Sequence, residues 1–150
     1  MQDHNVSRVP LQLVRNCVVA SIQVDLSEGV LSQFRTDLLA MLQHTNAASV
    51  ILDVSGVEVM DLVEFEALRQ TVDMARLMGA RSIFSGFRAG VVSALVELDA
   101  EVESIHAALN LDAAFDALET EPEADLDTAD PADEQAVNDA ADSMREPSDG

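Results

Sequence analysis

One stretch near the middle of the chain, residues 50–64, limits most strongly what the chain can fold into. It begins with the aliphatic run Val50-Ile51-Leu52, which is typical of a strand buried in a parallel sheet. Gly56 then marks a turn, and Asp61 with Glu64 three residues later forms the capping box that starts many helices. A buried strand followed closely by a capped helix predicts an α/β fold, in which helices cover a sheet.

The rest of the chain repeats this alternation of short strands and helices. Short runs of aliphatic and β-branched residues mark the predicted strands, and apolar residues recur at helical spacing in the predicted helices. In chain order the elements are strands at 9–14 and 17–24, a helix at 30–45, a strand at 49–54, a helix from the Asp61 cap to Gly79, a strand at 82–85, a helix at 90–98, a strand at 102–106 and a helix at 109–118. This order predicts a mixed sheet of four to five strands with four helices, because the first two strands form a hairpin.

Polar residues at the helix ends refine these boundaries. Asp25 and Glu28 are spaced as a capping box, which predicts that the first helix starts beside them. Asn46 is placed to end that helix and Gly79 to end the second, because both residues tolerate the left-handed conformation that follows a helix. The second helix is predicted to bury one face, which consists of Phe65, Leu68, Val72, Ala75 and Met78.

The last part of the chain differs in kind from the rest. Residues 119–150 hold 12 acidic residues and one basic residue, so that −11 of the total charge of −20 falls there and −9 falls on residues 1–118. This segment has three prolines and no aromatic residue, and it cannot bury enough apolar surface to offset the entropy of ordering. The sequence therefore predicts one folded domain at 1–118 and a disordered acidic tail at 119–150.

Composition disfavours several classes of function. An acidic chain is unsuited to nucleic acid or to an anionic membrane, since both require a positive surface. All eight basic residues are arginine, which removes the lysine of phosphate loops and of Schiff bases. Cys17 stands alone and the three histidines are scattered, so no metal-ligand spacing is present. We expect no cofactor, no metal and no catalytic residue, and the polar N-terminus predicts a cytoplasmic protein.

Several short stretches match one family in their order and spacing. They include Asn16-Cys17, Thr45-Asn46-Ala47, Asp53-Val54-Ser55-Gly56, Ser85-Gly86 and Ala108-Leu109-Asn110-Leu111. On these residues the chain resembles STAS domains, the sulfate-transporter and anti-anti-sigma fold, over residues 8–118. Within that family it is most similar to the RsbS-type scaffold of bacterial stressosomes. The resemblance implies the STAS fold and a signalling role without enzyme activity.

The resemblance also implies partners. RsbS-like proteins assemble with RsbR-like STAS sensor proteins into a very large shell, and this shell holds an RsbT-like serine/threonine kinase until stress releases it. We therefore expect self-association in a large oligomer and binding to both kinds of partner. Two alternatives stay open. One is a stand-alone anti-anti-sigma factor that binds an anti-sigma kinase, and the other is a small enzyme of flavodoxin-like fold, which the missing motifs disfavour.

In that family the regulatory phosphate is carried by a serine at the first helical position, directly after the capping Asp. The positive end of a helix accommodates a phosphate, and the added charge changes the docking surface for a partner. In this chain the corresponding residue is Leu62, which has no hydroxyl group. The predicted partner-binding residues surround this helix start and are Ser55, Gly56, Glu58, Asp61, Leu62, Glu64 and Phe65.

Three interpretations of Leu62 compete. In the first, the switch is lost and the chain is a permanently unphosphorylated scaffold. In the second, a fixed negative charge imitates the phosphorylated state, and its source is the group of acids Glu58, Asp61, Glu64 and Glu66. In the third, another hydroxyl takes the phosphate, and the candidates are Ser55, Ser85 and Ser93. Acids are also favoured in the first turn of a helix for dipole and capping reasons alone.

Overall fold

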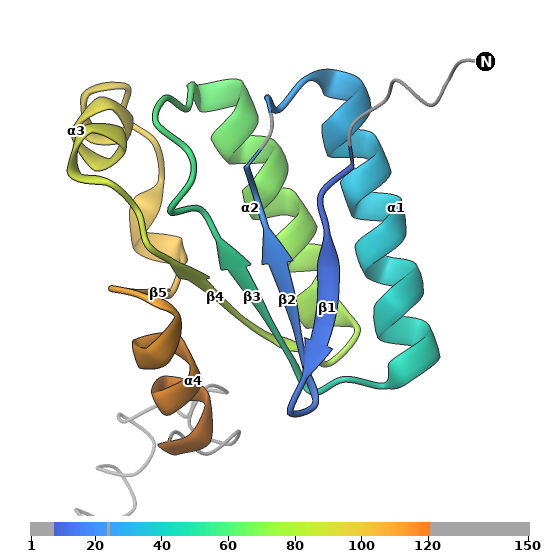
Figure 1. The fold of residues 1–150 in the computed structure, drawn as a ribbon. Coiled ribbons are helices and arrows are strands. Elements are labelled where there is room, and N and C mark those ends of the chain that lie inside the picture. The colour runs from blue at the N-terminus through green and yellow to red at the C-terminus, as the bar shows by residue number, and fades with distance from the viewer. Residues whose placement is uncertain (1–7, 24, 121–150) are drawn as a thin grey trace, which may run out of the picture. The chain divides into compact units, whose positions relative to one another are not determined.

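The computed structural model describes residues 8–23 and 25–120, in which strands alternate with helices (Figure 1). The strands are β1 (Leu11–Val14), β2 (Cys17–Ser21), β3 (Ser49–Asp53), β4 (Arg81–Ser85) and β5 (Ala107–Ala108). The helices are α1 (Glu28–Thr45), α2 (Leu62–Leu77), α3 (Ala89–Glu97) and α4 (Leu111–Thr120), with a 3-10 helical turn at Val102–Ser104. The predicted α/β fold, with a mixed sheet and four helices, is confirmed. The predicted acidic tail lies outside the described residues from residue 121 onward.

The five strands form one sheet in the order in which they occur in the chain. β1 and β2 are antiparallel and form the predicted hairpin, whose turn residues Arg15 and Asn16 have φ values of 53° and 62°. β2, β3, β4 and β5 are parallel to one another. The register places Ser21, Asp53 and Ser85 side by side at the ends of their strands. The loops that follow these three strands therefore meet at one edge of the sheet.

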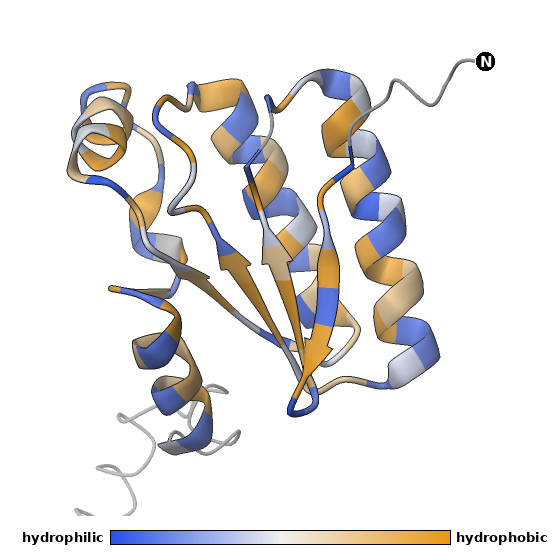
Figure 2. Cartoon of the chain, viewed as in Figure 1, coloured by the Kyte–Doolittle hydropathy of each residue, from blue (hydrophilic) through white to orange (hydrophobic). Residues whose placement is uncertain are grey.

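The main hydrophobic core lies between the sheet and helices α1 and α2, which cover the same face (Figure 1). Figure 2 shows the strands as largely hydrophobic, whereas the helices alternate between hydrophobic and hydrophilic residues. This difference follows from burial, because an inner strand is covered on both faces and a surface helix on one. The largest fully buried side chains of this core are Phe34, Phe65, Phe84, Ile22, Leu38, Leu52, Met60, Leu68 and Leu95.

A smaller hydrophobic cluster lies on the opposite face of the sheet, beneath α4. Successive side chains of a strand point to opposite faces of the sheet. Those that point toward α4, which are Val19, Ile51 and Ile83, pack with Ala114 of that helix. The Arg81 guanidinium anchors the end of the helix by donating to the Leu118 carbonyl oxygen at 3.0 Å. Cys17 belongs to this cluster as a small buried side chain, and burial raises the pKa of its thiol.

Two predictions about the helix ends need correction, and two are confirmed. Gly79 directly follows the C-cap of α2 with φ 94°, as predicted. The residue that caps α1 is Ser27 rather than Asp25, because the Ser27 hydroxyl accepts a hydrogen bond from the Val30 amide at 3.2 Å. Met78 does not belong to the buried face of α2, since the helix ends at Leu77 and the Met78 side chain is exposed. Asn46 ends α1 as predicted, in the left-handed conformation with φ 54°.

The strand predicted at residues 102–106 is wrong. Val102 starts a 3-10 helical turn, and Val102 and Ile105 pack as partly buried side chains against the main core. Their apolar character therefore reflects the packing of a turn. The strand begins directly after the predicted range, where Ala107 and Ala108 pair with Phe84 and Ser85 of β4.

A comparison of neighbouring residues on α2 tests this packing. Phe65 is fully buried, so Phe65→Ala should lower the free energy of unfolding by about 3–5 kcal/mol. Val63 is 74% exposed, and Val63→Ala should change it by less than about 0.5 kcal/mol. Urea denaturation followed by circular dichroism measures both values. Equal losses in the two variants would contradict the described orientation of α2.

Candidate functional site

The loops after β2, β3 and β4 converge at the carboxyl edge of the sheet, and backbone hydrogen bonds tie them together. The Ile22 amide donates to the Asp53 carbonyl oxygen at 3.0 Å, and the Val54 amide donates to the Ser85 carbonyl oxygen at 2.9 Å. These bonds continue the parallel ladder one residue beyond the strands. The loop at residues 54–61, which leads into α2, therefore starts from a fixed position.

Side chains and close contacts shape the first part of this loop. Asp53 Oδ1 accepts a hydrogen bond from the Ser55 amide at 3.1 Å, and Arg88 Nε donates to the Ser55 carbonyl oxygen at 2.9 Å. Gly86 has φ +82°, and a Cβ atom there would lie 2.8 Å from the Ser55 Cβ atom. A side chain at position 86 would thus be strained and would collide with the loop. Arg88 and Gly86 join the β4–α3 loop to the β3–α2 loop.

The capping box predicted at the start of α2 is confirmed. Asp61 Oδ1 accepts from the Glu64 amide at 2.8 Å, and Glu64 Oε1 accepts from the Asp61 amide at 3.0 Å. The two carboxylates satisfy backbone donors that a helix start otherwise leaves open. Leu62 is the first helical residue, and its side chain is half-buried.

Exposed apolar side chains stand on both sides of this cap. Val59 is 82% exposed and Val63 is 74% exposed, and Leu62 lies between them in the chain. Glu58 and Asp61 are exposed acids of the same segment. An exposed apolar group bordered by charged residues is typical of a protein-binding surface. We call the residues 58, 59 and 61–64 the α2 entry surface.

The structure separates the predicted site residues into exposed and buried ones. Ser55 and Gly56 are exposed and lie in the loop before the α2 entry surface. The assignment of Phe65 to a partner surface needs correction, because its side chain is fully buried in the core. Ser85 is also fully buried, so in this fold a kinase cannot reach its hydroxyl group. Ser93 is exposed on α3, away from the cap in the sequence.

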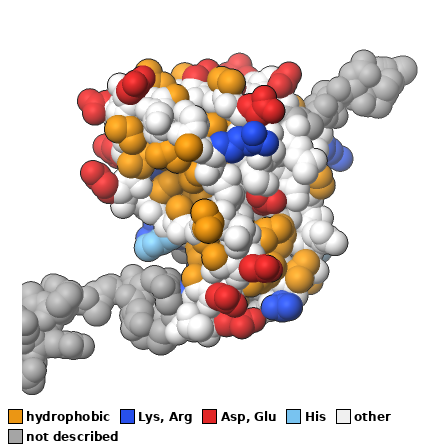
Figure 3. Space-filling model, turned by 60° about the vertical axis from the view of Figure 1, so that its left-hand side comes forward, with side chains coloured by type: hydrophobic (Ala, Val, Ile, Leu, Met, Phe, Trp, Pro, Cys, Tyr) orange, Lys and Arg blue, Asp and Glu red, His pale blue; other side chains and the backbone are white. Residues whose placement is uncertain are grey.

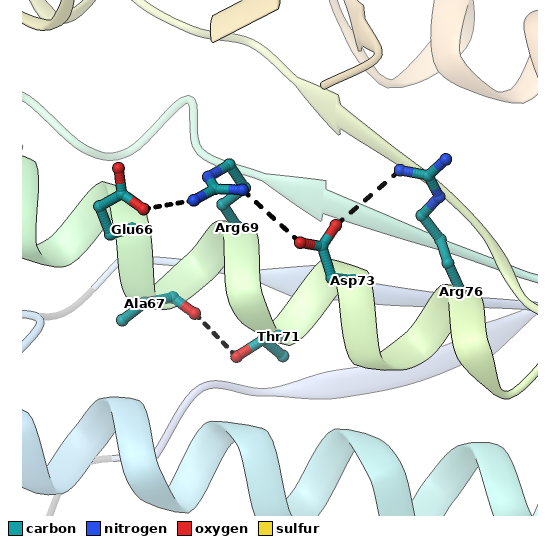
Figure 4. Close-up of polar contacts among 6 residues, drawn as sticks. All are labelled: Glu66, Ala67, Arg69, Thr71, Asp73 and Arg76. Carbon is teal, nitrogen blue, oxygen red and sulfur yellow. Dashed lines mark hydrogen bonds and ion pairs between the residues drawn. The ribbon is translucent and has the colours of Figure 1, made fainter. Parts of the chain in front are cut away.

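Most of the acids near the start of α2 are engaged by their neighbours. Asp61 and Glu64 hold the cap, as described above. Figure 4 shows Glu66 pointing toward Arg69, which donates a hydrogen bond to it and also lies 3.6 Å from the Asp73 carboxylate. The hydrogen bond to Glu66, followed by the charges of nearby acids, raises the pKa of Arg69. Asp61, Glu64 and Glu66 therefore each stabilise α2, which explains the presence of three of the four acids proposed to imitate a phosphate.

Sequence reasoning missed Val59, Val63 and Arg88. The two valines carried a usable signal, since both lie outside the helical pattern that Phe65 and Leu68 define. Arg88 carried no such signal, because its contact with Ser55 joins residues 33 positions apart. Such a contact depends on the pairing of β3 with β4.

The structure shows no feature of a metal centre or a membrane span in the part that it describes. Within residues 8–23 and 25–120, no three side chains of the metal-binding types come together. None of the described helices is long and apolar enough to cross a membrane.

Comparisons with known proteins place this geometry in a family. The family model of the STAS domain matches residues 8–124, and the chain therefore belongs to the STAS domain family. Among solved structures it is similar to a serine-to-glutamate variant of RsbS from Moorella thermoacetica. That likeness has a TM-score of 0.66 and 27% sequence identity, and it covers 75% of this chain and 96% of that one. No curated protein matches the chain significantly.

Two further structures extend the comparison. A chain from a structure of the stressosome, described as a signal integration and transduction hub, has a TM-score of 0.66 and 25% identity, and the match covers 73% of this chain and 96% of that one. A putative anti-sigma factor antagonist from Thermotoga maritima has a TM-score of 0.63 and 13% identity, over 74% of this chain and 94% of that one. The last likeness concerns the fold alone.

The cap can be tested separately from any partner. Asp61→Ala should lower the free energy of unfolding by about 1 kcal/mol, because the Glu64 amide loses its acceptor. Glu58→Ala, which removes an exposed acid three residues earlier, should change it by less than about 0.5 kcal/mol. Chemical denaturation of both variants gives the comparison. An unchanged Asp61→Ala variant would show that the capping box does not stabilise the domain.

Proposed function

We propose that this chain is a non-enzymatic scaffold of a stressosome-type signalling complex in the cytoplasm. In this role it associates with an RsbR-like STAS partner and sequesters an RsbT-like kinase. The observation that carries the proposal is the likeness to RsbS, which extends over 96% of that chain at 27% identity. The second stressosome structure, similar to this chain at 25% identity, supports the same role.

We assign kinase binding to the α2 entry surface. Its exposed apolar residues, Val59 and Val63, supply contact area, and Glu58 and Asp61 border them with negative charge. The partner that fits this surface has an apolar hollow bordered by arginine or lysine. Because Arg88 ties the preceding loop to the β4–α3 loop, the surface is already ordered before a partner arrives.

We further propose that Leu62 prevents phosphorylation of this scaffold at the helix start. The bound kinase is then not released by that route. Leucine accepts no phosphate, and the side chain is half-buried at the first helical position. Asp61, Glu64 and Glu66 each stabilise the helix itself, so their presence is explained without a role in imitating a phosphate. Ser55 and Ser93 remain the exposed hydroxyl groups for a relocated phosphorylation site.

A charge placed within the α2 entry surface tests kinase binding. Val63→Glu should weaken the affinity for an RsbT-like kinase by about 10-fold or more, because it puts a charge into the apolar contact. Leu77→Glu is the matched control, since Leu77 is 89% exposed on the last residue of the same helix. Isothermal titration calorimetry measures both affinities. Equal effects of the two variants would refute the assignment of this surface.

The lost switch has its own test. Leu62→Ser, incubated with an RsbT-like kinase and ATP, should gain one phosphate at position 62, whereas the unaltered chain should gain none there. Mass spectrometry of the digested protein locates the modification. A phosphate on Ser55 or Ser93 of the unaltered chain would instead support a relocated switch. Failure of the Leu62→Ser variant to gain phosphate would refute the placement of the site.

The native mass decides between the scaffold and a stand-alone anti-anti-sigma factor. A scaffold forms a particle near the megadalton range with its RsbR-like partner, whereas the stand-alone factor forms a small complex with its kinase. Size-exclusion chromatography with light scattering separates the two outcomes. A chain that stays small in the presence of the STAS partner would favour the stand-alone factor.

A further inference from the structure

Ser55 carries an exposed hydroxyl group on a turn that precedes the α2 entry surface. The Val57 amide donates to the Val54 carbonyl oxygen at 3.0 Å and closes this turn around Ser55. Within the part of the chain that the structure describes, the Ser55 hydroxyl group forms no hydrogen bond. An enzyme that modifies hydroxyl groups can therefore approach it from solvent, and a kinase bound at the α2 entry surface would lie beside it.

Arg88 brings a positive charge to Ser55. Its Nε–H group donates to the Ser55 carbonyl oxygen at 2.9 Å, which uses one of the five N–H donors of the guanidinium group. The Arg88 side chain is exposed, and it forms no ion pair with an acid of the described residues. The chain has 28 acidic residues, and acidic side chains are spread over the face of the molecule that Figure 3 shows. An arginine without a carboxylate partner keeps its other N–H donors available for another anion.

The β4–α3 loop holds the Ser55 side chain near this charge. A Cβ atom on Gly86 would lie 2.8 Å from the Ser55 Cβ atom, so the two loops are in close contact there. Arg88 precedes α3 as its N-cap residue, and this helix start has neither a side-chain cap nor an acid in its first turn. A helix start favours negative charge, which adds to the attraction by the guanidinium group. A negative group on the Ser55 side chain would thus meet a positive environment.

Asp53 is the acidic neighbour that opposes such a charge. Its Oδ1 atom accepts a hydrogen bond from the Ser55 amide at 3.1 Å and would lie 3.3 Å from a Cβ atom on Gly86. A phosphate on Ser55 would repel this carboxylate and attract Arg88, whose hydrogen bond to a phosphate oxygen is stronger than that to a neutral carbonyl oxygen. Both hydrogen bonds that now fix the Ser55 backbone would therefore weaken together.

Ser93, the other exposed candidate, lacks this environment. It is the fifth residue of α3 and lies beyond the first turn of the helix. The structure gives its side chain no contact with an arginine among the described residues. A phosphate on Ser93 would thus gain neither a guanidinium partner nor the positive end of the helix. The structure favours Ser55 of the two.

We propose that Ser55 is a phosphorylation site of this scaffold and that Arg88 binds its phosphate. A serine/threonine kinase transfers the γ-phosphoryl group of ATP, so that the bond from the Ser55 Oγ atom to phosphorus forms and the bond from phosphorus to the bridging oxygen breaks. ADP leaves, and the hydroxyl proton passes to a base of the kinase. Arg88 then exchanges the Ser55 carbonyl oxygen for the phosphate and releases the loop that leads into α2. The inference rests on the proposed function, and it supplies a switch that Leu62 cannot.

Phosphorylation of the full chain by an RsbT-like kinase with ATP tests the site. Mass spectrometry of the digested protein should locate one phosphate on Ser55. Ser55→Ala should gain none there, whereas Ser93→Ala, the matched control, should still be modified at Ser55. A kinase that binds the chain but leaves Ser55 unmodified, or modifies Ser93 alone, would overturn the inference. A kinase that does not bind the chain would instead count against the proposed function.

The contact with Arg88 is tested without a kinase, in the full chain with phosphoserine incorporated at position 55 during translation. A guanidinium group beside the phosphate favours its doubly charged form and lowers the pKa of its second ionisation. Arg88→Gln should therefore decrease the second acid dissociation constant of the phosphate by about 3-fold or more, as measured by phosphorus NMR titration. Arg76→Gln, at an exposed arginine in the last turn of α2, should leave this constant unchanged. Asp53 is present in every variant, so its opposing effect is the same in all.

Urea denaturation of Arg88→Gln checks that the fold is retained, since this variant also loses the contact with the Ser55 carbonyl oxygen. A phosphate that ionises alike with and without Arg88 would overturn its binding by this residue. The role as a switch has a separate measurement, because the chain with phosphoserine at position 55 should bind the kinase about 10-fold or more weakly than the unmodified chain. Equal affinities in isothermal titration calorimetry would overturn that role.

Discussion

The parallel pairing of β2, β3 and β4 is the constraint on which the rest of the structure depends. Because the three strands share one register, Ser21, Asp53 and Ser85 end them side by side. Every loop that follows these strands must therefore start from the same edge of the sheet. The hydrophobic cores on the two faces keep the strands in that register. A shift of one strand by one residue would move the side chains of the main core to the face under α4, and those under α4 to the main core.

The start of α2 keeps its shape through local hydrogen bonds that do not involve the side chain of Leu62. The capping box between Asp61 and Glu64 starts α2 whatever residue stands at position 62. Leu62 can therefore replace a hydroxyl residue without loss of the helix. In the proposed scaffold, Asp61 and Glu64 hold the shape of the partner-binding surface, whereas the phosphorylation switch would depend on the residue at position 62.

The sequence predicted those parts of the fold that depend on residues close together in the chain. The Asp61–Glu64 box and the Asn46 helix end are local, and both are present in the structure. The start of α1 was missed because Asp25 with Glu28 has the spacing of a capping box, while Ser27 forms the actual hydrogen bond. Two plausible caps so close together cannot be ranked from spacing alone.

Features that depend on tertiary contacts were beyond the reach of local patterns. The position of β5 follows from its pairing with Phe84 and Ser85, so apolar residues at 102–106 were mistaken for a strand. Burial of Ser85 depends on neighbouring elements, and the sequence alone did not exclude it as a phosphorylation site. The start of α2 was therefore predicted where the structure has it, but the exposed and buried residues around it could be separated only in three dimensions.

Arg88 gives the molecule a property that neither of the two loops it joins has alone. Its guanidinium group holds the loop before α2 through Ser55, and its backbone is the N-cap of α3. A partner that displaces this side chain from the loop before α2 would break the contact between the two loops. If that changed the free energy of binding at the loop before α3, binding there would change the free energy at the first loop by the same amount. One hydrogen bond of 2.9 Å is thus the contact through which the two loops can affect one another.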